Sequence, residues 1–139
     1  MSAQVRTGEA LRRDPRFEEF VARFNAGRFF AAHEVLEELW LEVTGEERDF
    51  LQGLVQVAVA LEHRARGNGA GAAKVLARAR RRLRGYGERH AGLPLEAILA
   101  GTEACLAGTQ KDPPRLPPRA RGRTAGVRKA TGAKKAAKR

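Results

Sequence analysis

The chain is poor in the features that define several common protein classes. Its 139 residues include one cysteine, Cys105, which excludes an intrachain disulfide and a cysteine-rich zinc module. Its apolar runs are far shorter than the roughly 18–20 residues that span a bilayer, and no signal-peptide core stands near the N-terminus. Motifs typical of dinucleotide, nucleoside triphosphate and serine hydrolase sites are also missing. We therefore expect a cytoplasmic protein with no membrane partner.

Acidic residues are scarce at the C-terminal end. The segment 111–139 holds 11 basic residues and one acid, whereas residues 1–110 hold 16 basic and 15 acidic residues. A segment of proline, glycine, alanine and cations cannot bury enough apolar surface to offset the entropy of ordering. We therefore expect a disordered basic tail over 109–139, a flexible N-terminus over 1–13 and one folded domain over 14–108.

The apolar residues of that domain recur at helical spacing, and no segment shows a convincing strand pattern. Asp14 and Pro15 form a typical helix start, because Asp caps free N–H groups and Pro suits the first turn. Breaks that contain glycine or proline separate the expected helices, 14–24, 28–43, 46–66, 70–86 and 94–107. Because the joints are short, we predict an all-α fold, an antiparallel bundle of about five helices.

Two ionisable residues of the expected helix 28–43 stand apart from its acidic face. At 100° per residue Glu34, Glu38 and Glu42 share one face, whereas His33 and Glu37 fall inside the apolar arc. An ionisable group on an inward face needs a partner, because an unpaired buried charge is costly. We therefore expect His33 and Glu37 to be paired.

The expected helix 46–66 carries a stripe where neutral side chains replace the charges typical of a surface. The stripe comprises Gln52, Gln56, Val59 and His63. If the chain reverses at Gly45, Glu37 lies beside Gln52. His33 then lies beside Gln56, and His63 lies roughly 10 Å further along. The pattern predicts a buried or half-buried polar seam between the two helices.

Two stretches carry a family resemblance, FNAGRFFAAHEVLEELW and, after it, FLQGLVQVAVALEHRARGN. They closely resemble the bacterial and archaeal family named domain of unknown function 309. The hallmark of that family, HxxxExx(W/Y), is met by His33, Glu37 and Trp40, and the resemblance covers roughly Phe17 to Tyr86. It implies an all-helical fold and a suggested role of the motif in metal binding, without an established activity.

The motif supports two hypotheses. In the first, His33 and Glu37 bind a divalent metal ion (Zn, Mn, Fe or Ni) or a small ligand, and metal-assisted hydrolysis is the reaction that fits. A catalytic zinc site usually has three protein ligands. The candidates for a third ligand or for the surrounding pocket are Trp40, Gln52, Gln56 and His63. In the second hypothesis, His33, Glu37 and Gln56 form a buried polar network that locks two helices together in a structural adaptor.

The expected helix 70–86 points to a different class of function. It is rich in Arg, and no acid stands between Glu62 and Glu88. The candidate nucleic-acid residues are Arg78, Arg81, Arg82, Lys134 and Lys135. Such a face and tail would bind phosphates without sequence preference and with strong salt dependence, as a non-enzymatic interaction module. Because about seventy residues in the first four expected helices give a modest core, we also expect that a homodimer could form through a helix face.

Overall fold

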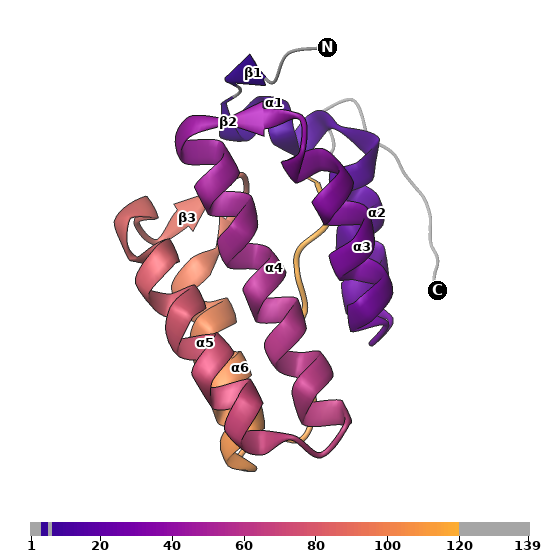
Figure 1. The fold of residues 1–139 in the computed structure, drawn as a ribbon, viewed down its shortest axis with the longest axis vertical. Helices are drawn as coiled ribbons and strands as arrows, with labels where there is room; N and C mark the ends of the chain where they lie inside the picture. Colours follow the sequence, from indigo (N-terminus) through magenta and orange to yellow (C-terminus); the bar gives the residue numbers. More distant parts are fainter. Residues whose placement is uncertain (1–3, 6, 120–139) are drawn as a thin grey trace, which may run out of the picture.

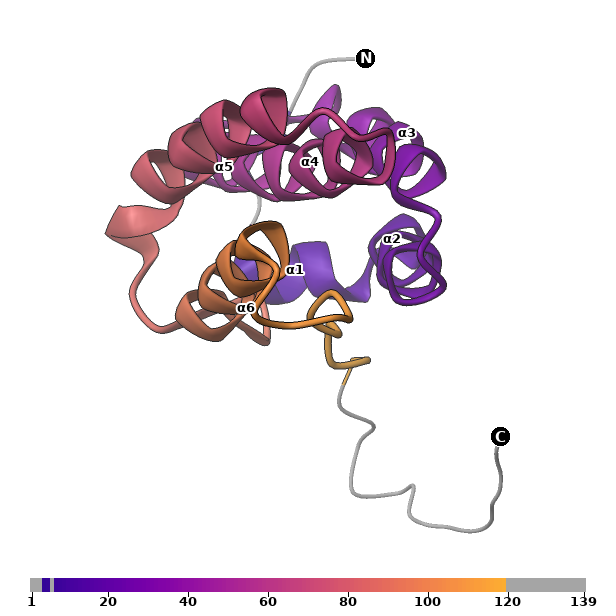
Figure 2. The same cartoon turned by 90° about the horizontal axis from the view of Figure 1, so that it is seen from below.

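The protein folds into two layers of helices, which lie one behind the other in Figure 1 and appear edge-on in Figure 2. The structure is a computed structural model that describes residues 4–5 and 7–119. Its helices are α1 (Gly8–Arg13), α2 (Pro15–Asn25), α3 (Phe29–Trp40), α4 (Gly45–Ala65), α5 (Gly69–Leu83) and α6 (Leu95–Ala107). The predicted all-α bundle is confirmed, with α1 added before the five expected helices. None of the helices in this described part is both long and apolar enough to cross a membrane.

Helix α4 is the centre of the first layer, with α3 on one side of it and α5 on the other (Figure 2). Helices α1, α2 and α6 form the second layer, in which α2 packs against α3 and α6 against α5. The apolar faces of both layers meet in one core. Its largest fully buried side chains include Phe17, Phe20, Phe24, Leu36, Leu39, Phe50, Leu54, Leu61 and Leu83. The second layer therefore covers one face of α3, α4 and α5, and their opposite faces form an outer surface of the bundle.

Local chemistry sets the helix boundaries. The Asp14 side chain accepts a hydrogen bond from the Arg16 backbone N–H, and Pro15 occupies the first turn of α2, as expected. Gly27 follows α2 with a φ of 79°, a left-handed conformation that favours glycine. Helix α3 ends at Trp40, three residues earlier than predicted, because the chain there extends into a short strand.

Two pairs of two-residue strands accompany the helices. β1 (Gln4–Val5) pairs with β2 (Val43–Thr44) in parallel, and β3 (Arg89–His90) pairs with β4 (Leu93–Pro94) as an antiparallel hairpin. Strands of this length show no alternation of apolar and polar residues, so the pattern of the sequence could not reveal them.

Ordered structure extends into both segments that flank the predicted domain. Residues 8–13 form α1, because Thr7 Oγ1 accepts a bond from Ala10 N at 3.1 Å and Leu11 is fully buried. Leu116 is buried too, and its backbone N and O each form a 2.8 Å hydrogen bond with the Asn25 side chain. Residues 120–139, which include the candidates Lys134 and Lys135, lie outside the described residues.

Candidate functional site

The His33–Glu37 pair lies on the outer surface of α3. His33 Nε2 is 3.1 Å from Glu37 Oε2, and the Glu37 side chain is 57% exposed. The pairing agrees with the spacing of the two residues, but the expected inward position of Glu37 is wrong. The buried arc is narrower than predicted, since the apolar residues Phe30 and Leu41 of the expected helix 28–43 are 51% and 66% exposed. Helices α2 and α4 pack against α3 on its inner side, and the exposed Glu34, Glu37 and Glu38 lie on its outer edge.

The stripe on α4 is half-buried, as predicted, but Gln56 and His63 bond to partners outside α3, and Gln52 has no hydrogen bond to another described residue. Gln56 Oε1 accepts a hydrogen bond from Arg82 Nε at 3.3 Å, and His63 Nδ1 lies 3.2 Å from Asn68 Nδ2. Within residues 7–119 neither His33 nor Glu37 bonds to Gln52 or Gln56. The structure therefore does not form the predicted seam between α3 and α4 through hydrogen bonds.

Trp40 joins α3 and α4 by another contact. The guanidinium carbon of Arg48 stands 4.0 Å from the centroid of the Trp40 ring, a cation–π geometry. The ring is partly buried and packs against the core. Arg48 Nε is buried without a hydrogen-bond partner among the described residues. The motif tryptophan thus holds an α4 cation at the end of α3.

The motif alone supplies two metal ligands. In the described part of the chain, no three His, Cys, Asp or Glu side chains gather in a way that could hold a metal ion. His33 and Glu37 could ligate an ion together with a ligand from another molecule, which leaves the metal hypothesis as a prediction.

Helix α5 is followed by a short 3-10 turn, η1 (Arg84–Tyr86). Some cations of these two elements are paired with carboxylates, and the others are not. Arg82 pairs with Asp49 and bonds to Gln56, and Arg80 pairs with Glu103 at 3.1 Å and Glu96 at 3.5 Å. The candidate nucleic-acid residue Arg82 is therefore already compensated, whereas the candidates Arg78 and Arg81 are available. The exposed cations without an ion pair to another described residue are Lys74, Arg78, Arg81 and Arg84.

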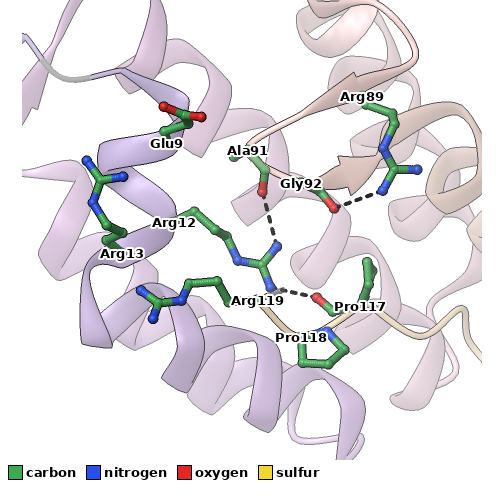
Figure 3. Close-up of a pocket in the computed structure, with 9 residues that line it drawn as sticks. All are labelled: Glu9, Arg12, Arg13, Arg89, Ala91, Gly92, Pro117, Pro118 and Arg119. Atoms are coloured by element: carbon green, nitrogen blue, oxygen red, sulfur yellow. Dashed lines mark hydrogen bonds between the residues drawn. The ribbon is translucent and has the colours of Figure 1, made fainter. Parts of the chain in front are cut away.

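A cavity of about 610 Å³ opens between α1, the β3–β4 hairpin and the C-terminal segment (Figure 3). Its charged lining residues are Glu9, Arg12, Arg13, Arg89 and Arg119. No pattern in the sequence predicts this cavity, because its residues lie far apart in the chain and each looks like an ordinary surface residue. The arginine cluster becomes visible only in the folded chain, where four arginine residues line one cavity.

Arg12 is the buried centre of that lining, with a side chain only 7% exposed. Its Nε donates to Glu18 Oε2 at 3.0 Å, Nη1 to the Ala91 carbonyl at 3.1 Å and Nη2 to the Pro117 carbonyl at 2.6 Å. These bonds join α1, α2, the hairpin and the C-terminal segment. Arg12 therefore fixes the walls of the cavity, and Glu18 compensates its charge.

The third histidine of the chain, which no motif singles out, secures the hairpin. His90 Nε2 lies 2.8 Å and 3.0 Å from the two carboxylate oxygens of Glu47 on α4. Its ring also packs edge-on against Phe50 and Tyr86. The Tyr86 hydroxyl donates to the Glu46 carbonyl at 2.5 Å, and burial raises the pKa of Tyr86 to about 12. These contacts hold the hairpin, and with it one wall of the cavity, against α4.

Known proteins resemble this chain over its central part. A family model described as "Domain of unknown function (DUF309)" matches residues 17–75. An "Uncharacterized protein" of Aquifex aeolicus (strain VF5) is 34% identical over 96 residues, which cover 67% of this chain and 28% of that protein. The "Uncharacterized protein YpuF" of Bacillus subtilis (strain 168) is 40% identical over 61 residues, 42% of this chain and 35% of the relative.

The match to these two relatives therefore spans about a third of their lengths. A solved structure gives fuller coverage: the crystal structure of a conserved hypothetical protein, TTHA0068, from Thermus thermophilus has a TM-score of 0.60 and 38% identity. The match covers 67% of this chain and 97% of that one. The expectation drawn from the His33, Glu37 and Trp40 region is confirmed at the level of the family, and the chain belongs to the domain of unknown function 309 family.

Proposed function

We propose that this protein is a binding domain that engages the phosphate backbone of nucleic acid through the exposed cations of α5 and η1. One observation carries the proposal: of the six cations on these two elements, Arg80 and Arg82 are paired with carboxylates while the other four have no described partner. The free cations are Lys74, Arg78, Arg81 and Arg84. Solubility alone requires charged residues but does not require that unpaired charges of one sign cluster on one face.

The geometry of these four cations suits a phosphate backbone. From Lys74 to Arg84 the chain rises roughly 15 Å, and duplex DNA carries one charge per about 1.7 Å of axis. The cations therefore face several phosphates at once, and binding releases counterions. No aromatic side chain stands among them, so this face would read charge rather than base identity.

Charges elsewhere in the chain also favour binding of a polyanion at the α5 face rather than at the α3 face. The exposed acids Glu34, Glu37 and Glu38 lie on α3, at the opposite edge of the layer, where they repel a polyanion. Residues 120–139 contain eight basic residues and no acid, among them Lys134 and Lys135. Their charge would add to affinity for any phosphate backbone without adding sequence preference.

The test is fluorescence anisotropy of the full chain with labelled single-stranded RNA and duplex DNA over a salt series. Each phosphate contact contributes about one unit to the slope of log K against log salt. We expect Arg78→Glu with Arg81→Glu to lower that slope by about two. Lys134→Gln with Lys135→Gln should lower it less, because the six other cations of residues 120–139 can replace their contacts.

Arg28→Glu is the matched control, since Arg28 is an exposed cation at the start of α3. We expect this variant to keep the slope of the original protein. The proposal fails if the control weakens binding as much as Arg78→Glu does alone, or if the full chain binds neither nucleic acid at low salt.

The His33–Glu37 pair favours a second candidate function, metal binding. The two side chains lie 3.1 Å apart and both reach the surface, so an ion could replace their mutual contact. A third ligand from a second copy would make a homodimer part of the site, and metal-assisted hydrolysis would depend on that ion. Elemental analysis should find zinc, manganese, iron or nickel in untagged protein and not in the His33→Ala, Glu37→Ala variant. Metal-free protein that gains no thermal stability from these ions would refute this candidate.

A further inference from the structure

We infer that the arginine-lined cavity between α1, the β3–β4 hairpin and the C-terminal segment binds a phosphomonoester group carried by an organic moiety of nucleotide size. The four guanidinium groups of its lining belong to Arg12, Arg13, Arg89 and Arg119 (Figure 3). The site differs from the α5 face of the proposed function in both location and ligand.

The first argument is the charge of the lining. The lining carries four guanidinium groups and one carboxylate, that of Glu9. Because Glu18, which lies outside the lining, pairs with Arg12, the excess positive charge belongs to Arg13, Arg89 and Arg119. The side chains of Arg13 and Arg119 form no ion pair or hydrogen bond with another described residue. A cleft lined by charges of one sign concentrates the electrostatic potential, and arginine binds phosphate oxygens in a two-pronged geometry. An anion would relieve the repulsion among these groups.

The second argument is that the central cation is already in place. Arg12 uses three of its five N–H donors on Glu18, Ala91 and Pro117, which holds its guanidinium rigidly. Gly92 permits this position: its φ is 74°, and a Cβ there would come within 3.3 Å of Arg12 Nη1. A group that is fixed before binding loses little side-chain entropy when the ligand arrives. The exposed Arg13 and Arg119 can then close around the ligand.

The third argument is size and surface. A volume of about 610 Å³ is far larger than a phosphate ion and falls in the range of sites for small organic molecules. Pro117, Pro118 and Ala91 add apolar wall beside the cations. Such a wall suits a ring or another weakly polar moiety attached to the phosphate. The phosphate could belong to a free mononucleotide or to the 5′ end of a strand.

The lining residues all lie outside the segment 17–75 that the family model matches. They lie in α1, in the hairpin and in the C-terminal segment, whereas the exposed cations of the proposed function lie on α5 and η1. Substitutions can therefore affect one surface and leave the other unchanged.

The experiment is isothermal titration of the full chain with uridine 5′-monophosphate, uridine and inorganic phosphate. We expect the nucleotide to bind at least tenfold more tightly than uridine or phosphate alone. Arg13→Glu with Arg119→Glu should remove nucleotide binding, because both side chains lack other described partners and their loss spares the bonds of Arg12. The Arg28→Glu control should bind like the original protein.

A second titration separates the two sources of the phosphate. A short strand with a 5′-phosphate is compared with the same strand ending in a 5′-hydroxyl, in the Arg78→Glu, Arg81→Glu background that weakens the α5 face. Preference for the phosphorylated end that depends on Arg13 and Arg119 supports the site and assigns its ligand to a strand end. Preference for the free mononucleotide, with the same dependence, supports the site and assigns it a small molecule.

The inference is overturned if nucleotide and nucleoside bind alike, if neither the nucleotide nor the phosphorylated strand binds, or if the Arg13→Glu, Arg119→Glu variant binds as well as the original. Failure of the proposed function has a different signature. Nucleotide binding would then persist in every α5 variant while the salt-dependent binding of duplex DNA would be absent.

Discussion

Helices α3 and α5 flank the same central helix in the same layer, yet their outer faces differ completely. The outer face of α3 displays acids and the apolar side chain of Phe30, and the exposed Leu41 follows the last residue of the helix. The outer face of α5 displays cations and alanines, with Gly69 and Gly71 at its start and a half-buried Val75. Their inner faces, in contrast, are alike, with leucines and alanines packed into one core. The fold therefore depends on what the two helices share, and any binding specificity must come from what separates them.

The largest effect should distinguish the inner from the outer face of α3. Leu36 of α3 is fully buried, whereas Leu41, directly after the last residue of α3, is 66% exposed. Leu36→Ala should lower the free energy of unfolding by about 2–5 kcal/mol, because it leaves a cavity in the core. Leu41→Ala should change it by about 0.5 kcal/mol or less. Urea denaturation measures both, and similar losses would mean that the outer face of α3 is covered in solution, as in a homodimer.

The next effect concerns how closely α4 and α5 approach one another. A Cβ added at Gly53 would lie 2.5 Å from Cδ2 of the buried Leu83, whereas nothing lies within 4 Å of one added at Gly69. Gly53→Ala should therefore cost about 1–3 kcal/mol of unfolding free energy through overpacking. Gly69→Ala should be neutral or stabilise by up to about 1 kcal/mol. Equal stability of the two variants would contradict the close packing of α5.

A charge substitution can make α3 more like α5. Glu38 is exposed on α3 and has no ion pair with another described residue. Glu38→Lys should raise the affinity for duplex DNA about threefold at low salt, because it removes repulsion and adds a cation. Glu38→Gln should give a smaller rise. An increase that persists at high salt would show that the effect is not electrostatic.

The smallest effect tests the motif pair itself. Glu37→Gln should change the free energy of unfolding by about 0.5 kcal/mol or less, since an exposed ion pair contributes little. Glu34→Gln, an exposed neighbour on the same helix, is the control. A loss of about 2 kcal/mol for Glu37→Gln alone would restore the hypothesis of a buried polar network, despite the 57% exposure of the Glu37 side chain.

Local features could be predicted well from the sequence, because they depend on residues a few positions apart. The cap at Asp14 and Pro15, the apolar faces and the contact between His33 and Glu37 all follow from helical periodicity. The exposure of Glu37 could not be predicted in the same way. It depends on which neighbours cover α3, and the periodicity of one helix does not say how wide its covered arc is.

Long-range pairing accounts for the other differences. Arg82 looks as free as Arg78 in the sequence, but Asp49, 33 positions earlier, neutralises it. The cavity depends on Arg12, Arg89 and Arg119, which no local pattern connects. Leu116 is the one large apolar residue between Leu106 and Val127, and it is too isolated to suggest an ordered segment.

The three bonds of Arg12 also have a consequence for the order of folding. Its carbonyl partners, Ala91 and Pro117, lie 79 and 105 positions away in the chain. Closing loops of this length is entropically expensive, so such contacts form after the local helix pairs have assembled. The same contacts should open first in native-state hydrogen exchange, as a unit that includes the hairpin and the C-terminal segment. The cavity is then a late and reversible feature of the fold, and a ligand that occupies it would tie α1 to segments about a hundred residues further along the chain.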